Sequence, residues 1–331
     1  MKAAFYEGRG PAREVLRVGE QPTPEPGPGE VRVKIAVSAV NPSDTKSRGN
    51  WLGATAMAFA RIIPHQDGAG IIDKVGLGVD ERRIGQRVWL YMAQLGRPFG
   101  TAAEYTCVPA AQAVQLADNA DFAAGASLGV PAMTAHYALF GNGALTGKTV
   151  LVQGGAGAVG FYAVQLAKWG NAAHVVATVS RAEQAEQAKR AGADTIVNYR
   201  SGDIVARLRG QFGKAAPVDL IVEVAFGANQ ANNTALLAEN GIIAAYSSDA
   251  DPRPVLDFPA FLWKDATLRT LIIYKAPQAA RELAARDINA LMAEGNLQHQ
   301  VAARYSLDDI AAAHEAMEGG RSIGKVLVDI G

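Results

Sequence analysis

Residues 149–160 have the sequence TVLVQGGAGAVG, a short apolar run that ends in a cluster of glycines. Residues 155–160 match the pattern G-x-G-x-x-G, and a Gly- and Ala-rich stretch over 157–169 that is typical of a helix overlaps its end. Glycines let a backbone approach a pyrophosphate closely, and the N–H groups at the start of the helix can bind its charge. The stretch therefore predicts a nucleotide-binding turn formed by Gly154, Gly157, Ala158, Val159 and Gly160. The alternative is a turn whose glycines serve only the packing of strand against helix.

The residues around this turn alternate between strands and helices. Short apolar runs predict strands at 149–153, 174–179, 195–199, 218–225 and 241–247, and the stretches between them predict helices at 157–169, 181–191, from 203 and near 229–238. Strands joined by helices of this length form βαβ crossovers, which give a parallel sheet covered on both faces. Residues 123–274 are therefore predicted to form an α/β domain.

The first 122 residues have a different sequence pattern. Short β-type runs at 31–37, 70–75 and 87–91 are separated by segments rich in Gly and Pro, a pattern typical of a small, mostly antiparallel β domain. Residues 275–331 are predicted to return to this domain through helices at 278–295 and from 308 and strands at 301–305 and 325–328.

The composition limits the classes of function. The chain has 331 residues, enough for two domains at roughly 150 residues each, and its 32 basic side chains balance 32 acidic ones. Because the formal net charge is zero, the chain has no overall electric field to attract polyanions, and nucleic acid and anionic membranes are not expected partners. The single cysteine, Cys107, cannot form an internal disulfide or a thiolate zinc cluster, and no apolar run is long enough to span a bilayer. We expect a cytoplasmic protein.

The residue after the second strand of the α/β domain distinguishes the nicotinamide cofactors. NAD sites have an acid about 20 residues after the glycine pattern, whereas this chain has Ser180 followed by Arg181. Residues 180–183 have the spacing of a capping box, which would turn Glu183 back onto the helix start. Arg181 can then bind a 2′-phosphate, so the sequence predicts NADPH. The alternative for Arg181 is a solvated arginine at a helix start.

Further motifs make the chain similar to a known family. The stretches NPSD at 41–44, PHQDGAG at 64–70 and GQRVW at 85–89 resemble the N-terminal domain of medium-chain dehydrogenases/reductases. With AGAD at 191–194 before TIVNYR at 195–200, the chain most resembles the zinc-independent quinone oxidoreductase (zeta-crystallin-like) branch over its whole length. The resemblance implies a GroES-like catalytic domain (1–122 and 275–331), a doubly wound Rossmann domain (123–274), and an active site in the cleft between them.

The resemblance also implies that no metal takes part. Where the zinc alcohol dehydrogenases of this superfamily have a cysteine ligand, this chain has Asn41, and Gln66 stands at the position of a histidine ligand. Amides are poor zinc ligands. His65 is interpreted as a structural or surface residue, and the other histidines have no ligand spacing: His136, His174, His299 and His314.

The family's functional residues are carried over by similarity. Asn41 is expected beside the nicotinamide, Trp51 in the substrate pocket, and Asp44 either in catalysis or as a helix cap. Thr134 is expected near the nicotinamide and Tyr199 near the adenosine phosphate. Further candidates for cofactor binding are Tyr246 and Ser247, for which a plain strand-end turn is the alternative, and the basic residues Arg321 and Lys325 near the last strand.

Without a metal, hydride transfer depends on positioning and on hydrogen bonds to the acceptor, which suits a quinone or a conjugated carbonyl. The leading hypothesis is a zinc-independent, NADPH-dependent quinone reductase. The alternatives are an NADPH-dependent double-bond reductase of enones, alkenals or enoyl thioesters, and a non-catalytic NADPH-binding protein. The β-type run at 267–274 is placed at a sheet edge and predicts a homodimer formed by pairing with its copy.

Overall fold

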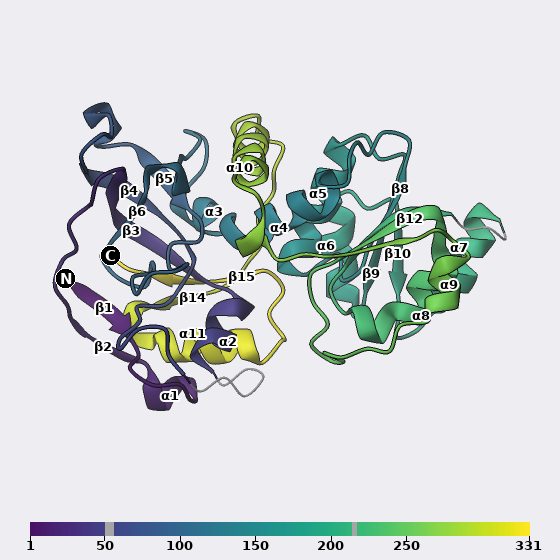
Figure 1. Ribbon diagram of the computed structural model, residues 1–331, viewed down its shortest axis with the longest axis horizontal. Helices are drawn as coiled ribbons and strands as arrows, with labels where there is room; N and C mark the ends of the chain where they lie inside the picture. Colours follow the sequence, from purple (N-terminus) through teal and green to yellow (C-terminus); the bar gives the residue numbers. More distant parts are fainter. Residues whose placement is uncertain (50–55, 214–216) are drawn as a thin grey trace. The chain divides into compact units, whose positions relative to one another are not determined.

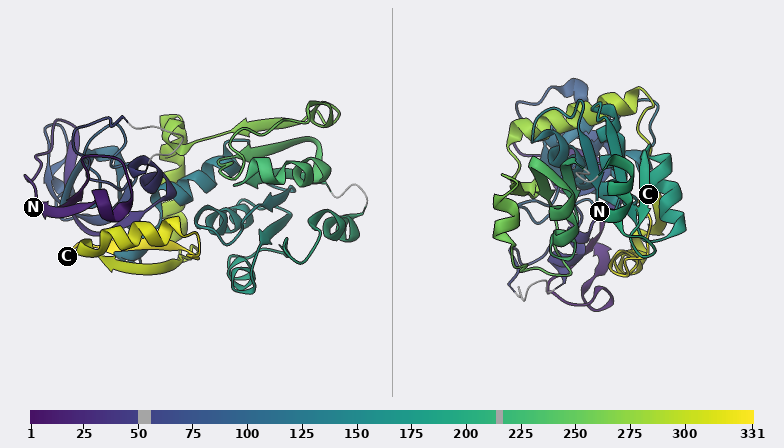
Figure 2. Two further views of the ribbon diagram at one scale, coloured as in Figure 1. Left: turned by 90° about the horizontal axis from the view of Figure 1, so that it is seen from below. Right: turned by 90° about the vertical axis from the view of Figure 1, so that its right-hand side faces the viewer.

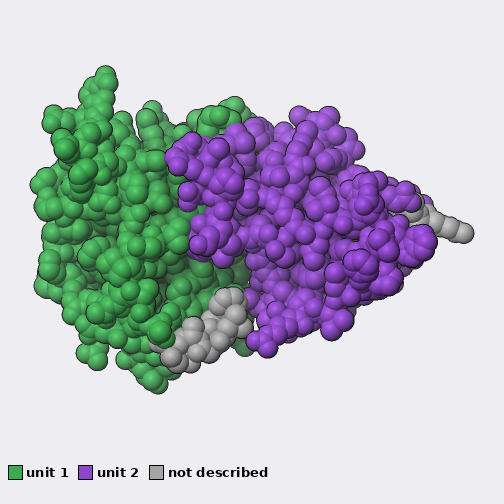
Figure 3. All heavy atoms as spheres, viewed as in Figure 1, with its two compact units in different colours: residues 1–130, 285–331 green, residues 131–284 purple. Residues whose placement is uncertain are grey.

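The computed structural model describes residues 1–49, 56–213 and 217–331. The chain forms two compact units: unit 1 contains residues 1–130 and 285–331, and unit 2 contains residues 131–284 (Figure 3). The sequence placed the boundaries at 122 and 274, before helices α4 (Gly129–Phe140) and α10 (Gln278–Ala293). In the structure each boundary falls within one of these helices, after Val130 in α4 and after Ala284 in α10.

Unit 2 is built on a six-stranded parallel sheet with the strand order β10-β9-β8-β11-β12-β13 (Figure 1). Its strands are β8 (Thr149–Val152), β9 (His174–Val179), β10 (Thr195–Asn198), β11 (Val218–Glu223), β12 (Leu237–Ala245) and β13 (Thr267–Thr270). The order reverses between β8 and β11, and ligands of such sheets bind at the carboxyl ends of the strands beside this reversal. The predicted doubly wound α/β fold is confirmed.

The helices of unit 2 cover both faces of the sheet (Figure 2). The crossovers through α5 (Ala158–Trp169) and α6 (Ala182–Arg190) run in one direction along the sheet. The crossovers through α7 (Ile204–Phe212), α8 (Phe226–Leu236) and α9 (Phe258–Leu262) run in the opposite direction along the sheet. Because such connections are right-handed, the two sets of helices lie on opposite faces of the sheet. Leu151, Val176, Ile221 and Ile243 lie in register across four strands and form one core with α7, α8 and α9.

Two predicted elements of unit 2 have different bounds in the structure. The helix predicted near 229–238 begins at Phe226, and β12 begins at Leu237 rather than at 241. The strand passes through Asn240, whose φ is 58°, and its pairing with β11 shifts register between Val218 and Leu220, as at a bulge. The edge strand predicted at 267–274 ends at Thr270, because residues 273–275 form a 3₁₀ turn.

Unit 1 contains a seven-stranded sheet in which most neighbours are antiparallel. Its path is β14-β15-β3-β4-β5-β7, with β6 also paired to β3 and a parallel pair between β14 and β15. The strands are β3 (Glu30–Val40), β4 (Asp67–Val75), β5 (Arg87–Leu90), β6 (Tyr105–Pro109), β7 (Ala113–Gln115), β14 (Val301–Ser306) and β15 (Lys325–Asp329). The runs predicted at 31–37 and 70–75 are confirmed as parts of β3 and β4, and the run predicted at 87–91 is confirmed as β5 except for its last residue.

The helices of unit 1 pack beside this sheet. Unit 1 also contains a two-stranded ribbon formed by β1 (Lys2–Phe5) and β2 (Arg17–Glu20). Its helices are α1 (Ala12–Val15), α2 (Pro42–Arg48), α3 (Phe122–Ala126) and α11 (Ile310–Glu318). Helix α2 begins directly after β3 and contacts α11, so residues far apart in the sequence become neighbours. Over the described ranges, none of the helices has both the length and the apolar character that a membrane crossing needs.

Candidate active site

Two glycines of the turn after β8 are required by packing alone. A Cβ on Gly160 would lie 2.1 Å from the carbonyl oxygen of Gly154, and a Cβ on Gly155 would lie 2.5 Å from the Cβ of Ala177. Gly154 itself has a φ of 71°, which favours glycine. For these three positions the packing interpretation is sufficient.

Gly157 needs another explanation. It is the residue before α5, its φ of −71° suits any side chain, and a Cβ there would meet only the Gly154 carbonyl at 3.3 Å. The backbone N–H groups of Ala158, Val159 and Gly160 point out of the first turn of α5 with no hydrogen-bond partner among the described residues. A helix start with open N–H groups and no side chain in front of it fits the pyrophosphate of a dinucleotide.

A buried polar network supports this turn, and the sequence analysis did not identify it. The N–H of Gly154 donates to Thr178 Oγ1 (2.9 Å), the Thr178 hydroxyl donates to Gln153 Oε1 (2.7 Å), and Gln153 Nε2 donates to Asn233 Oδ1 (2.8 Å). Asn233 in turn donates to the buried carboxylate of Glu223. The only signal in the sequence was a glutamine at the end of an apolar strand. The network fixes the ends of β8, β9 and β11 relative to one another.

The residues predicted to bind the 2′-phosphate lie together at the carboxyl ends of β9 and β10. Val179 pairs with Asn198, so Ser180 and Tyr199 follow neighbouring strands, and the Tyr199 N–H donates to the Val179 carbonyl (3.0 Å). The Tyr199 side chain is 55% exposed, so its ring is available to a ligand. Arg181 is the N-cap residue of α6.

The predicted capping box at 180–183 is wrong. The helix begins one residue later than the motif implies, with Arg181 rather than Ser180 at the N-cap, so the third helical residue is Gln184. Both the N–H and the hydroxyl of Ser180 donate to Gln184 Oε1, at 2.8 and 2.9 Å. Gln184, not Glu183, therefore closes on the helix start and holds Ser180 in place.

Three further cofactor candidates lie in unit 2. The Tyr246 N–H donates to the Glu223 carbonyl (2.9 Å), and the Ser247 carbonyl accepts from the Phe226 N–H (3.2 Å), so both residues sit at the carboxyl ends of β11 and β12. Burial raises the pKa of Tyr246, so its hydroxyl stays protonated. Thr134 is buried in α4. Their contacts with a cofactor stay predictions.

In unit 1, Asn41 lies in a buried polar cluster with Asp67 and Lys325, which we call the Asn41 cluster. Asn41 Nδ2 donates to Asp67 Oδ2 (2.8 Å), and the Lys325 ammonium donates to both Asn41 Oδ1 and Asp67 Oδ2, the latter at 3.1 Å. The exposed fractions of the three residues are 2%, 0% and 3%. The ammonium of Lys325, for which the sequence predicted a cofactor contact, is thus bonded to groups of its own unit. Arg321 lies on the exposed turn before β15.

Asp44, the third residue of α2, caps the start of the helix and is buried beside the cluster. Its Oδ2 accepts from the Asn41 N–H (2.8 Å), and Pro42 is the first residue of the helix. Burial, and after it the charge of Asp67, raises the pKa of Asp44 to about 7. The capping alternative is therefore confirmed, while a catalytic role for Asp44 stays untested. Trp51 lies outside the described residues.

His65 is a buried structural residue, and the surface alternative for it is wrong. Its Nδ1 bonds to Ser38 Oγ (2.7 Å) and its Nε2 bonds to His314 Nε2 (2.9 Å), while His314 Nδ1 accepts from Arg48 Nε (3.3 Å). Burial lowers the pKa of His65 well below its usual range and that of His314 to about 3, so both rings stay neutral. The pair links α11 to the segment before β4, and Arg48 joins α2 to the same chain of bonds.

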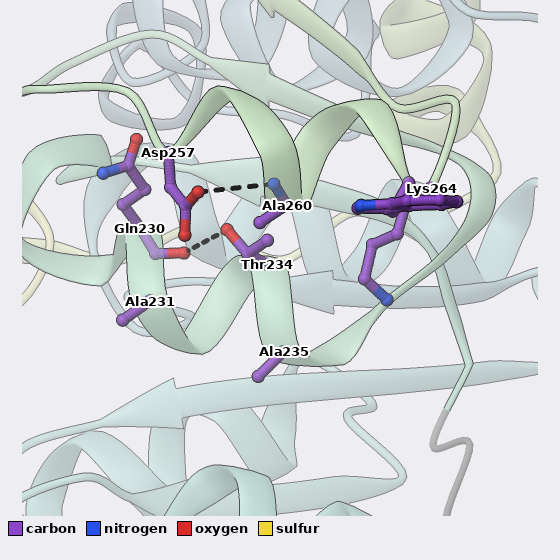
Figure 4. A pocket seen from close by; sticks show the side chains of 8 residues that line it. Gln230, Ala231, Thr234, Ala235, Asp257, Ala260 and Lys264 are labelled. Carbon is purple, nitrogen blue, oxygen red and sulfur yellow. Dashed lines mark hydrogen bonds between the residues drawn. The ribbon is translucent and has the colours of Figure 1, made fainter.

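The hollow drawn in Figure 4 lies elsewhere in unit 2, between α8 and α9. Thr234 and Asp257 in its wall make hydrogen bonds within their own helices, to the Gln230 carbonyl and the Ala260 N–H. Its lining residues include none of the predicted site residues: Gln230, Ala231, Thr234, Ala235, Asp257, Ala260, Trp263 and Lys264. We assign no chemistry to it.

Comparisons with known proteins agree with this arrangement. Residues 27–118 match the alcohol dehydrogenase GroES-like domain, and residues 191–328 match a domain described as zinc-binding dehydrogenase. A chloroplastic quinone-oxidoreductase homolog of Spinacia oleracea is 30% identical over 99% of this chain and 98% of its own. Two solved structures, each 26% identical, are an NAD-dependent alcohol dehydrogenase (TM-score 0.89, all of both chains) and a mycobacterial protein complexed with NADPH (TM-score 0.85, 99% of this chain and 100% of that one).

The side chains in the Asn41 cluster do not fit a zinc ion. The oxygens of Asn41 and Asp67 already accept from the Lys325 ammonium, whose charge would repel a second cation. Gln66 offers only a neutral amide, whose Oε1 has no partner among the described residues. In the described ranges, no three His, Cys, Asp or Glu side chains are arranged to hold a metal.

We expect the purified protein to contain no stoichiometric zinc and to keep its activity in the presence of a chelator. The reason is the donor set: two amides and a carboxylate already paired with an ammonium bind zinc poorly. Elemental analysis by mass spectrometry and assays with and without EDTA test this. One zinc per chain, or loss of activity on chelation that added zinc restores, would contradict it.

Proposed function

The chain belongs to the medium-chain dehydrogenase/reductase superfamily, in its quinone oxidoreductase branch, and from this premise we propose that it is a zinc-independent, NADPH-dependent reductase of quinones. The observation that carries the proposal is the buried Asn41 amide, which has the Lys325 ammonium on its oxygen where metal-dependent relatives have a zinc ligand. A site of this kind assists reduction through positioning and hydrogen bonds.

The cofactor proposal rests on unit 2. The open N–H groups at the start of α5 would bind the pyrophosphate, and Ser180, Arg181 and Tyr199 would surround the 2′-phosphate of NADPH. None of the three is an aspartate or glutamate, which removes the repulsion that a carboxylate at this edge would exert on the phosphate. When bound, the reduced nicotinamide supplies the hydride.

The acceptor proposal rests on what Asn41 can still donate. One Nδ2 hydrogen of its amide bonds to Asp67, and the second is left for the nicotinamide or the acceptor. A quinone suits such a neutral donor because its ring spreads the negative charge that hydride addition creates, and protons can follow from water. An alcohol would instead need a Lewis acid to stabilise its alkoxide.

NADPH oxidation with three acceptors in parallel tests this proposal: a small quinone, a 2-alkenal and an enoyl thioester. We expect the highest kcat/KM with the quinone. A higher value with the alkenal or the thioester would assign the chain to double-bond reduction instead. NADPH binding without turnover of any acceptor would identify a non-catalytic NADPH-binding protein.

We also propose that the protein is a homodimer in which β13 pairs with its copy. β13 forms the edge of the parallel sheet, and the segment just before it exposes large apolar side chains: Val255 at 87%, Phe258 at 63%, Leu262 at 63% and Trp263 at 85%. An unpaired strand edge beside such a patch is typical of an interface. A second copy of the chain would cover both.

Light scattering at micromolar concentration is expected to give twice the mass of one chain. Trp263→Glu places a charge in the patch and is expected to raise the dissociation constant of the dimer by about 30-fold or more, the effect of losing one central aromatic residue. Leu77→Glu, an equally exposed apolar position in unit 1, is the matched control and should leave the mass unchanged. A monomeric wild-type chain would contradict the proposal.

A further inference from the structure

Both atoms of the Asn41 amide bond to groups whose hydrogen-bonding roles are fixed. An ammonium can only donate, so the atom facing Lys325 must be the oxygen, Oδ1. A carboxylate can only accept, so the atom facing Asp67 must be the nitrogen, Nδ2. The orientation of an asparagine amide is usually ambiguous, but here the chemistry of its two partners determines it.

The partners are themselves held in place. Asp67 Oδ1 accepts from the Val130 N–H (2.9 Å) at the start of α4, and a Cβ on Gly129 would lie only 2.0 Å from that oxygen. The carboxylate is therefore fixed against the first turn of a helix, where a negative charge is favoured. Lys325 is the first residue of β15, whose next residue, Val326, pairs with Val40 of β3. Asn41 follows Val40 directly, so the sheet itself brings the ammonium to the amide.

We infer that Lys325 is a positioning residue for the proposed reaction: together with Asp67 it determines which atoms of the Asn41 amide remain to contact the cofactor or the acceptor. This inference rests on the proposed function, because it assumes that Asn41 acts at the reacting end of the cofactor. With the amide in the observed orientation, one Nδ2 hydrogen remains for the cofactor or the acceptor. With the amide reversed, donor and acceptor would exchange places.

Stability alone does not call for this arrangement. Replacing a buried ion pair by neutral groups of similar volume is often neutral or stabilising, whereas removing one partner leaves an uncompensated charge. A matched neutral replacement of both residues therefore separates a role in positioning from a role in folding.

The double variant Asp67→Asn/Lys325→Met provides this replacement. The oxygen of the amide introduced at position 67 can still accept from the Val130 N–H, so the NH₂ group of that amide faces Asn41. Asn41 then turns its own oxygen toward this NH₂ group. We expect the double variant to remain folded and to lose about 100-fold in kcat with a quinone, the size of effect expected when a reacting group is misplaced. The matched control is Arg32→Met/Asp73→Asn, which removes a partly buried pair (2.9 Å) between β3 and β4 that does not touch Asn41. The control should keep the wild-type kcat.

A cycle with Asn41→Ala decides whether Lys325 acts through Asn41. If it does, the double replacement adds no further loss of kcat once Asn41 is alanine. A double variant with the wild-type kcat, or a second full loss in the Asn41→Ala background, would overturn the inference.

A second pair of variants is used if the double variant folds poorly. Lys325→Arg still only donates, so it should keep more of the kcat than Lys325→Gln, which can donate or accept. Equal kcat values for these two variants would also overturn it.

A measurement without turnover separates this inference from the proposed function. The side-chain NH₂ signals of Asn41 are identified by NMR as the pair missing from Asn41→Ala. In the wild type they should exchange slowly with water, and in the double variant they should shift and exchange faster. A wild type that reduces no quinone would refute the proposed function and leave this NMR comparison to decide the inference. Unchanged signals in the double variant would refute the inference alone.

Discussion

Gly157→Val is expected to weaken NADPH binding by about 100-fold or more while leaving the protein folded. The backbone of Gly157 suits any residue, and a Cβ there meets only the Gly154 carbonyl, at 3.3 Å. The added side chain would instead stand in front of the open N–H groups at the start of α5. Losing two charge-assisted hydrogen bonds to a pyrophosphate, at ~1.5 to 3 kcal/mol each, corresponds to at least this factor. Fluorescence titration of NADPH measures it.

Two other glycine variants serve as controls for this prediction. Gly160→Ala brings a Cβ within 2.1 Å of the Gly154 carbonyl, so it should lower the melting temperature as well as the affinity. Gly210→Ala, at a position in α7 with open space around it, should change neither the affinity nor the fold. Unchanged NADPH affinity in folded Gly157→Val would mean that the cofactor does not bind at the start of α5.

Arg181→Ala is expected to weaken NADPH binding by about 10- to 100-fold and to leave NADH binding nearly unchanged. Only NADPH carries the 2′-phosphate, and a charge-assisted hydrogen bond to it contributes ~1.5 to 3 kcal/mol. Ser180→Asp should have the larger effect, because it repels the phosphate and offers an acceptor to the ribose hydroxyls of NADH. The backbone N–H of residue 180, which donates to Gln184 Oε1 in the wild type, would still hold the residue at the helix start, although the bond from the Ser180 hydroxyl is lost.

Steady-state kinetics with both cofactors on the wild type and these two variants test the prediction. Arg209→Ala, in the last turn of α7, is the matched control and should alter neither KM. A wild type that prefers NADH, or an Arg181→Ala protein with unchanged NADPH affinity, would show that the 2′-phosphate lies elsewhere. Tyr199 and Arg321 are the other candidates for sharing the phosphate, and their participation would place the loss at the low end of the range.

The sequence by itself determined the parts of this protein that depend on local patterns. Alternating apolar runs and helical stretches predicted the parallel sheet of unit 2, because a strand or a helix reveals its buried face within a few residues. The glycine turn was predicted for the same reason. Local patterns were less reliable at element boundaries. Helix α6 begins one residue later than predicted, so Gln184 rather than Glu183 is its third residue, and β12 begins at Leu237 rather than at 241.

Only the tertiary structure decided how the polar residues are partnered. Asn41 and Lys325 are 284 residues apart in the chain, and His65 and His314 are 249 apart, so no local period relates them. The sheet of unit 1 brings the first pair together because β15 pairs with β3 immediately before Asn41. A charge that is buried by folding must find a partner among whatever residues the topology places beside it. Lys325 found its partners in Asn41 and Asp67 in this way, and its predicted contact with the cofactor stays a prediction.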